Sequence, residues 1–103
     1  MATTLNIDTV ERGDSLVLMV DGELDISTTH LLHEALIRAQ ETDAVRIVVD
    51  LQAVSFIDSS GLHVLIKHAC GEESRGRIRL TTGSRQVQRL FELTGARDYL
   101  PFV

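Results

Sequence analysis

Several residue types are scarce in this 103-residue chain, and each scarcity excludes a class of protein. The single cysteine, Cys70, cannot form an internal disulfide, which excludes a small disulfide-stapled secreted domain. No apolar run approaches the roughly 20 residues of a membrane-spanning helix, and the first residues lack the basic region and apolar stretch of a signal peptide. With 44% hydrophobic and 24% charged residues, the composition is that of an ordinary soluble globular protein. We therefore expect one cytoplasmic domain over residues 1–103, without membrane association.

Lysine and aromatic residues are also scarce, and the remaining charges are unevenly distributed. Residues 1–43 carry nine acidic residues against two arginines, whereas residues 75–97 carry six arginines and one glutamate. The net charge is −5, and few aromatic residues lie among the arginines to stack on bases, so we expect no nucleic-acid partner. The acidic and the basic segment are either two solvated faces of the protein or charged patches that match those of a protein partner.

Hydrophobic periodicity predicts eight elements in the order β-β-α-β-α-β-α-β. The strands are expected at residues 5–10, 16–20, 45–51, 77–81 and 99–103, and the helices after Ser27 or Thr28, after residues 58–60 and after Ser84. Residues 45–51 are almost continuously apolar, which is typical of a central strand covered on both faces. Helices that join strands imply crossover connections. We therefore expect an α/β fold with a small mixed, largely parallel sheet of about five strands and an N-terminal antiparallel hairpin.

The segment 56–61 places a hydroxyl group at the start of a predicted helix. Ser59 would lie in the first turn, where free backbone N–H groups and the positive end of the helix dipole favour a phosphate. A phosphate on Ser59 would add about −1.5 to −2 charges next to Asp58. Plain helix capping explains the same residues, and the two interpretations are compatible.

Enzymatic chemistry finds little support in the same segment. The nucleophile elbow of hydrolases needs a glycine two residues before the serine, where this chain has Ile57. Asp50 ends a predicted strand, as does the phospho-accepting aspartate of a response-regulator receiver, but the lysine needed after the last strand is absent because the chain has only Lys67. Neither a phosphate-binding glycine-rich loop nor a dinucleotide fingerprint occurs. We expect neither an enzyme nor a bound cofactor.

The histidines invite a metal site, but their spacing does not support one. His30 and His33 are three residues apart without further ligands at a telling distance, and His63 and His68 fall on different sides of a helix. We expect surface histidines and no bound metal. Cys70, late in a predicted helix, is expected to be a buried apolar residue and not a redox sensor.

Four stretches of the chain resemble the STAS-domain anti-sigma factor antagonists. Residues 56–62, Phe-Ile-Asp-Ser-Ser-Gly-Leu, resemble the family signature, and residues 22–25, Gly-Glu-Leu-Asp, resemble its motif after the second strand. Residues 48–56 are similar to its central strand and following loop, and residues 87–95 to its last conserved helix. The similarity covers nearly the whole chain in the right order.

This resemblance implies helices packed mainly on one face of the sheet and a protein regulated by phosphorylation, in settings such as stress response or sporulation. Ser59 matches the phosphorylated serine. The unphosphorylated form would bind an anti-sigma factor that is a serine kinase of the histidine-kinase-like ATPase type, which frees the sigma factor. The kinase, using ATP and Mg²⁺, would phosphorylate Ser59 and break the complex, and a metal-dependent serine phosphatase would restore it. The protein itself would be a monomer or weak dimer.

The implied partner-binding residues come from two of the matching stretches. They are Gly22, Glu23, Asp25, Asp58, Ser59, Ser60, Gly61, Leu62 and His63. The phosphoacceptor serine would be exposed beside Gly61, which lets a kinase approach the backbone closely. His63 departs from the family, which has a small residue at this position. A second interpretation stays open: a STAS scaffold or adaptor in a signalling complex or transporter assembly, without sigma-factor control.

Overall fold

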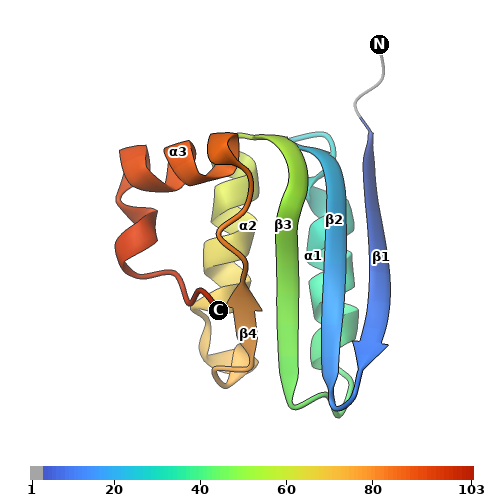
Figure 1. Cartoon of the computed structure of the whole chain (residues 1–103). Coiled ribbons are helices and arrows are strands. Elements are labelled where there is room, and N and C mark those ends of the chain that lie inside the picture. Colours follow the sequence, from blue (N-terminus) through green and yellow to red (C-terminus); the bar gives the residue numbers. More distant parts are fainter. Residues whose placement is uncertain (1–3) are drawn as a thin grey trace.

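The structure is a computed structural model that describes residues 4–103, within which one four-stranded sheet packs with three α-helices (Figure 1). The strands are β1 (Leu5–Arg12), β2 (Ser15–Leu24), β3 (Arg46–Ile57) and β4 (Ile78–Leu80). The α-helices are α1 (Thr29–Gln40), α2 (Ser59–Ala69) and α3 (Arg85–Thr94), and two 3₁₀ turns, η1 (Glu72–Ser74) and η2 (Ala96–Asp98), complete the chain.

The strands lie in the sheet in sequence order, β1-β2-β3-β4. β1 and β2 form the expected antiparallel hairpin, and β3 and β4 are added in parallel. Because crossovers between parallel strands are right-handed and each new strand is added on the same side, successive helices fall on one face of the sheet. Figure 1 shows α1 and α2 together behind the sheet, while α3 lies beyond the β4 edge.

The predicted C-terminal strand is not a full strand, so the expectation of about five strands is wrong by one. Phe102 makes a single parallel bridge with Leu80, supported by backbone bonds of 2.9 Å from Leu80 N–H to Pro101 O and from Val103 N–H to Leu80 O. Pro101 has no N–H to extend the ladder, and η2 takes up the residues just before this segment.

β3 extends to Ile57, well beyond the predicted end at residue 51. Two register shifts against β2 each insert one additional residue into β3, a bulge that leaves one residue unpaired. The buried positions of β3 therefore change from a spacing of two to a spacing of three, at Leu51, Val54 and Ile57. Through these bulges the strand reaches α2 without a loop.

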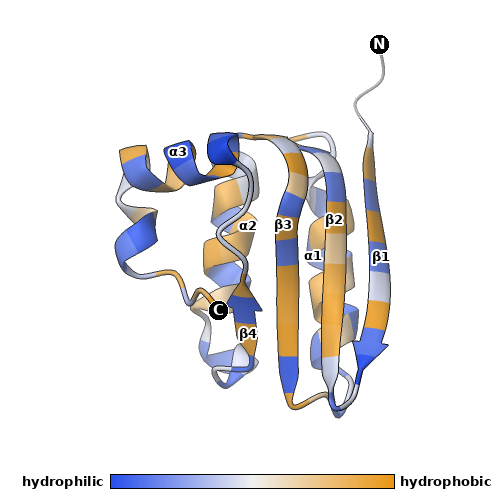
Figure 2. Ribbon diagram, viewed as in Figure 1, coloured by the Kyte–Doolittle hydropathy of each residue, from blue (hydrophilic) through white to orange (hydrophobic). Residues whose placement is uncertain are grey.

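The hydrophobic core lies between the sheet and the helices α1 and α2. Leu18, Val49 and Leu36 are at most 1% exposed, and apolar residues dominate the middle of β2 and the first half of β3 in Figure 2. The opposite face is uncovered: Val48 is half-buried and Met19 is 42% exposed. The prediction that residues 45–51 are covered on both faces is therefore wrong, because these strands alternate buried and accessible residues.

The three helices follow their predicted periodicity. α1 buries Leu32 and Leu36 one turn apart, and in α3 the Ser84 hydroxyl accepts a hydrogen bond from Val87 N–H as an N-cap. Gly95 ends α3 with φ of 77°, a left-handed conformation that glycine adopts without strain. Among the helices formed by residues 4–103, none is long and apolar enough to cross a bilayer.

Candidate phosphoacceptor site

The two segments that resemble the family motifs meet at one edge of the sheet. β2 and β3 are parallel and end opposite each other, with Leu24 paired to Ile57. α2 begins two residues after that pair, at the upper end of the sheet in Figure 1, and Ser59 is its first residue. Ser59 therefore follows the carboxyl ends of these parallel strands. This is the edge at which parallel α/β sheets usually carry their functional groups.

Asp58 is the N-cap of α2, and its carboxylate turns toward the helix. One carboxylate oxygen accepts hydrogen bonds from Ser60 N–H at 2.9 Å, from Gly61 N–H at 3.2 Å and from the Ser60 hydroxyl at 2.5 Å. The prediction of free N–H groups at this helix start is therefore wrong for Ser60 and Gly61. The Asp58 carboxylate, which was expected to face a partner, instead accepts hydrogen bonds from backbone N–H groups at the start of α2.

The neighbouring serines differ in their surroundings. Ser59 is exposed, and among the hydrogen bonds found within residues 4–103 none involves its hydroxyl. Ser60 is half-buried, and its hydroxyl is bound to the Asp58 carboxylate. Of the two, Ser59 is the hydroxyl that a second protein can reach.

Gly61 and Leu62, which the resemblance places among the partner-binding residues, are both buried against the core. A Cβ at Gly61 would lie 2.8 Å from the Leu24 Cγ atom and 3.0 Å from the Leu24 carbonyl oxygen. Leu62 is 6% exposed. Gly61 is thus needed for the close approach of α2 to the end of β2. His63, the next residue, is exposed as expected.

Gly22 and Glu23 lie near the end of β2, on either side of a register shift against β3. Gly22 has φ of 120°, and a Cβ there would overlap the Thr4 carbonyl oxygen, which accepts a hydrogen bond from Glu23 N–H at 3.0 Å. Gly22 therefore has a backbone role, while Glu23 is half-buried and keeps part of its side chain at the surface.

Asp25 organises the turn between β2 and α1. Its carboxylate accepts hydrogen bonds from the Ser27 hydroxyl at 2.6 Å and from Ser27 N–H at 2.9 Å. The Ser27 hydroxyl is the largest of the causes that hold the pKa of Asp25 below its ordinary value. Asp25 is therefore ionised in the neutral range and faces its own turn.

Two exposed apolar side chains belong to this edge and were missed as partner-binding residues. Ile26, in the turn after β2, is 82% exposed, and Phe56, near the end of β3, is 49% exposed. Phe56 faces outward because the bulge in β3 places Ile57, its neighbour, in the core. The sequence signal that could have identified Ile26 as a partner-binding residue is its position as an apolar residue in an otherwise polar turn.

The histidines and Cys70 differ in part from the predictions. His30 is exposed, but His33 and His68 are half-buried, and their ring nitrogens lie 2.8 Å apart. Cys70 is exposed and not buried, because it follows the last turn of α2. In the part of the chain that the structure describes, no three His, Cys, Asp or Glu residues gather as a metal site.

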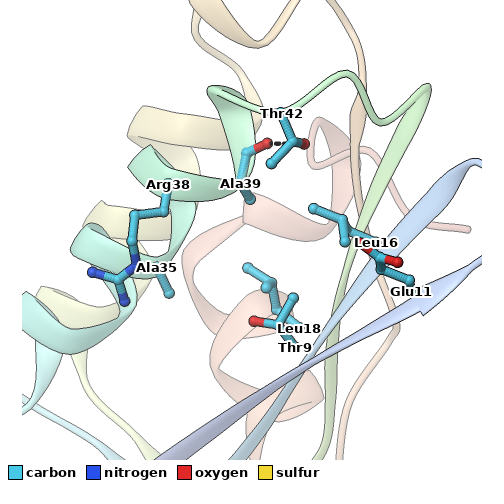
Figure 3. A pocket seen from close by; sticks show the side chains of 8 residues that line it. All are labelled: Thr9, Glu11, Leu16, Leu18, Ala35, Arg38, Ala39 and Thr42. Atoms are coloured by element: carbon cyan, nitrogen blue, oxygen red, sulfur yellow. Dashed lines mark hydrogen bonds between the residues drawn. The ribbon is translucent and has the colours of Figure 1, made fainter.

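A cavity of about 420 Å³ lies at the other end of the molecule, between α1 and the hairpin (Figure 3). Leu16, Leu18, Ala35 and Ala39 form its apolar part, and Glu11 and Arg38 also line it. The small alanines on α1 leave this space open beside the start of β2. It is remote from Ser59, which follows the opposite ends of the strands.

Comparisons with known proteins agree with the fold and the motifs. The STAS domain family model matches residues 6–103. An anti-sigma-B factor antagonist of Staphylococcus epidermidis is 31% identical over 97 residues, which cover 93% of this chain and 90% of that protein.

Solved structures show the same architecture. An anti-sigma factor antagonist from Mycobacterium paratuberculosis superposes with a TM-score of 0.83 at 24% identity, over 96% of this chain and 85% of that one. The anti-sigma factor antagonist SpoIIAA superposes in its unphosphorylated form (TM-score 0.71, 97% and 88% covered) and, from Bacillus, in its phosphorylated form (0.66, 97% and 91%), both at 22% identity. These likenesses establish the fold, and the family match covers nearly all of the sequence. The chain belongs to the STAS domain family.

Proposed function

We propose that this chain is an anti-sigma factor antagonist whose binding is switched off by phosphorylation of Ser59. The unphosphorylated form binds an anti-sigma factor that is itself a serine kinase of the histidine-kinase-like ATPase type, and the sigma factor is released. The name of the Staphylococcus epidermidis relative supports the role, and the two solved forms of SpoIIAA support control by phosphate.

The observation that carries the proposal is the difference between the two serines at the start of α2. Ser59 presents an exposed hydroxyl without an internal partner, whereas the Ser60 hydroxyl is held by Asp58. A kinase needs a hydroxyl that can enter its own site, so Ser59 is the acceptor. The Asp58 cap holds the helix start, and therefore Ser59, in one position.

A phosphate on Ser59 would change the surface and leave the fold intact. The N–H groups of Ser60 and Gly61 are already taken by Asp58, so they are not free to draw the phosphate inward. The group would remain at the surface with about −1.5 to −2 charges. Repulsion and lost shape complementarity would then break a complex formed around Ser59.

The surface around Ser59 combines apolar and acidic groups. Ile26 and Phe56 supply exposed apolar area, and Glu23 supplies negative charge at the same edge of the sheet. Interfaces commonly place such apolar groups at the centre and charges at the rim. The partner that fits has an apolar patch bordered by basic side chains.

The remaining features of the proposal follow the family. The whole chain acts as one cytoplasmic STAS domain, a monomer or weak dimer that binds no cofactor and catalyses no reaction. A metal-dependent serine phosphatase removes the phosphate and restores binding.

The test uses affinity capture from native extract of the source bacterium with three baits: wild type, Ser59→Ala and Ser59→Glu. Wild type and Ser59→Ala should capture the kinase-type anti-sigma factor, and Ser59→Glu should not. Incubation with that kinase, ATP and Mg²⁺ should add one phosphate to wild type and Ser60→Ala and none to Ser59→Ala, measured by intact mass. A phosphate on another residue contradicts the site, and capture of the same transporter or scaffold proteins by all three baits would instead identify a constitutive adaptor.

A further inference from the structure

Two histidines from different helices meet in the seam between α1 and α2. Nδ1 of His33 lies 2.8 Å from Nε2 of His68, and the ring centroids are 4.9 Å apart with planes inclined by 51°. Both side chains are half-buried. The two residues are 35 positions apart in the sequence, so their meeting joins the two helices that cover the sheet.

Gln40 fixes which nitrogen of His68 carries the proton. The Gln40 Nε2 atom donates a hydrogen bond of 3.2 Å to the Leu36 carbonyl oxygen, and it also lies 3.1 Å from Nδ1 of His68. The Leu36 carbonyl can only accept, so the amide nitrogen and not the amide oxygen must be on this side. Nδ1 of His68 therefore accepts, and its proton is on Nε2.

The same reasoning fixes the tautomer of His33. Since Nε2 of His68 carries a proton, it donates to Nδ1 of His33, which must be unprotonated. Nδ1 of His68 then accepts from the Gln40 amide, Nδ1 of His33 accepts from Nε2–H of His68, and both rings are neutral. The arrangement of Gln40, His68 and His33 is a single, internally consistent hydrogen-bond network.

An additional proton on either ring breaks this network. On His33 it would place Nδ1–H against the Nε2–H of His68, two donors separated by 2.8 Å. On His68 it would place Nδ1–H against the amide nitrogen of Gln40 at 3.1 Å. Rotation of the Gln40 amide would relieve that clash only by turning its oxygen toward the Leu36 carbonyl oxygen.

The charges around His68 come from three elements. Lys67 precedes it on α2, and His33 faces it from α1. The acidic residues Glu72 and Glu73 of η1 line a surface pocket together with His68, and Glu73 favours the protonated ring. Burial is the largest cause that lowers the pKa of His68 from its ordinary value near 6.5, followed by His33 and Lys67, while Glu73 raises it. The surroundings as a whole favour the neutral ring.

We propose that His33, His68 and Gln40 form a proton-sensitive clasp between α1 and α2, closed near neutral pH and opened by proton uptake in mildly acidic conditions. Opening frees the C-terminal part of α2 from α1. The clasp is distinct from Ser59, which starts the same helix about 13 Å away at a rise of about 1.5 Å per residue. The proposal does not depend on whether Ser59 is phosphorylated.

The sign of the effect on stability follows from proton binding. Because His68 binds a proton less readily in the folded state, the unfolded chain holds more protons just below pH 6.5. Stability is therefore complete above that pH and is lost as the pH falls toward the lowered pKa of His68. For one proton taken up on unfolding, the unfolding equilibrium constant changes by up to about tenfold per pH unit.

The test is urea unfolding of the full chain at a series of pH values between 7.5 and 5.5. Wild type and the control His63→Gln, which alters an exposed histidine on the same helix, should lose stability in parallel as the pH falls. His68→Gln should show at most half of that pH dependence, and His33→Gln should show a smaller pH dependence than wild type. Equal pH dependence in all four proteins would overturn the proposal.

A second measurement keeps the test decisive if a variant fails to fold. Nitrogen-15 NMR of wild type at pH 7.5 should show His68 protonated on Nε2 and unprotonated on Nδ1, and an NMR titration should show its pKa below 6.5. A His68 ring protonated on Nδ1 at neutral pH, or one whose pKa is not below 6.5, contradicts the clasp.

Discussion

The backbone N–H of Asp58 donates a hydrogen bond of 3.2 Å to the carbonyl oxygen of Leu24. This bond joins the end of β2 directly to the residue that caps α2. Gly61 adds to the same junction, because its Cα faces the Leu24 side chain without room for a methyl group. The two motifs near Ser59 are therefore one structural unit, and the position of the Ser59 hydroxyl depends on how β2 ends.

Gly61→Ala tests this junction. The added methyl group would lie within about 3 Å of Leu24 and Ile57 atoms, so α2 must shift outward or the side chains must leave their preferred rotamers. We expect a loss of about 1–3 kcal/mol in the free energy of unfolding, the usual cost of overpacking. Urea unfolding followed by circular dichroism measures it.

The control for this substitution is His63→Ala, at an exposed position on the same helix. Alanine there touches nothing in the core, so the expected change is within about 0.5 kcal/mol. If Gly61→Ala were as stable as the control, the packing of α2 on Leu24 would not constrain the site.

Phe56→Ala and Ile26→Ala test the exposed apolar side chains at the site. Because both are already accessible, their loss removes little core packing, but it removes apolar contact from any complex formed at this edge. We expect at least a tenfold weaker affinity for the captured anti-sigma factor, about 1.4 kcal/mol, with unfolding free energy nearly unchanged. Isothermal titration calorimetry and urea unfolding measure the two quantities.

Val45→Ala is the matched control for these two variants. Val45 is 64% exposed but precedes β3, at the opposite end of the sheet from Phe56. Its removal should leave affinity unchanged. Equal weakening by all three substitutions would place the binding surface elsewhere or show that it is not localised.

The helices were predictable because their signals are local. In α1 and α3 the apolar spacing lies within a few residues, and Ser84 and Gly95 bound α3 as expected, whereas Thr28 at the start of α1 makes no side-chain cap hydrogen bond. The end of β3 was not predictable by alternation, since each bulge moves the buried set by one residue. Periodicity thus predicted which elements exist and failed where pairing with a neighbour alters the period.

The site was predictable in position but only partly in roles. Ser59 and His63 are exposed as expected. Leu62, in contrast, belongs to the core, and the Asp58 carboxylate accepts hydrogen bonds from the backbone at the start of α2. A signature motif does not separate residues that bind a partner from residues that hold the binding loop. The contact of His33 with His68 depends on how two helices dock, which no local pattern reveals.

Ser27→Ala tests the electrostatics of the Asp25 turn. The Ser27 hydroxyl is the strongest influence that lowers the pKa of Asp25, so its removal should raise that pKa toward the ordinary value of 3.8. Since a lowered carboxyl pKa stabilises the fold above pH 3.8 and the benefit is lost as the pH falls through the lowered value, the variant should lose part of this stabilisation at neutral pH. Carbon-13 NMR titration of the Asp25 carboxyl group measures the shift.

Ser55→Ala serves as the control in that titration. The Ser55 hydroxyl donates to the Gly22 carbonyl oxygen at 3.2 Å, and among the hydrogen bonds within residues 4–103 none joins it to the Asp25 carboxylate. The pKa of Asp25 should be the same in this variant as in wild type. An Asp25 that also titrates unchanged in Ser27→Ala would mean that solvent already replaces the serine hydroxyl.

Arg77→Lys tests the closure of the turn after α1. The Arg77 guanidinium donates to three backbone carbonyl oxygens, those of Gln40 at 2.7 Å, Ala44 at 2.8 Å and Thr42 at 3.1 Å. The planar fork of arginine reaches all three at once, and its charge complements the negative end of the α1 dipole. A lysine ammonium keeps the charge but not the fork, so we expect a loss of about 1.5–3 kcal/mol in unfolding free energy.

Arg79→Lys, two residues further along in β4, is the comparison that separates geometry from charge. Within residues 4–103 the Arg79 guanidinium donates to two nearby carbonyl oxygens, those of Gly76 and Ile78, so its replacement should change stability by less than about 0.5 kcal/mol. A large difference between the two variants in urea unfolding means that the fork of Arg77 holds α1 to the start of β4. Because α1 also carries one half of the histidine seam, Arg77→Lys should weaken the His33–His68 contact as well, visible as greater exchange broadening of both rings by NMR. Equal, small effects would mean that water satisfies these carbonyl groups as well as arginine does.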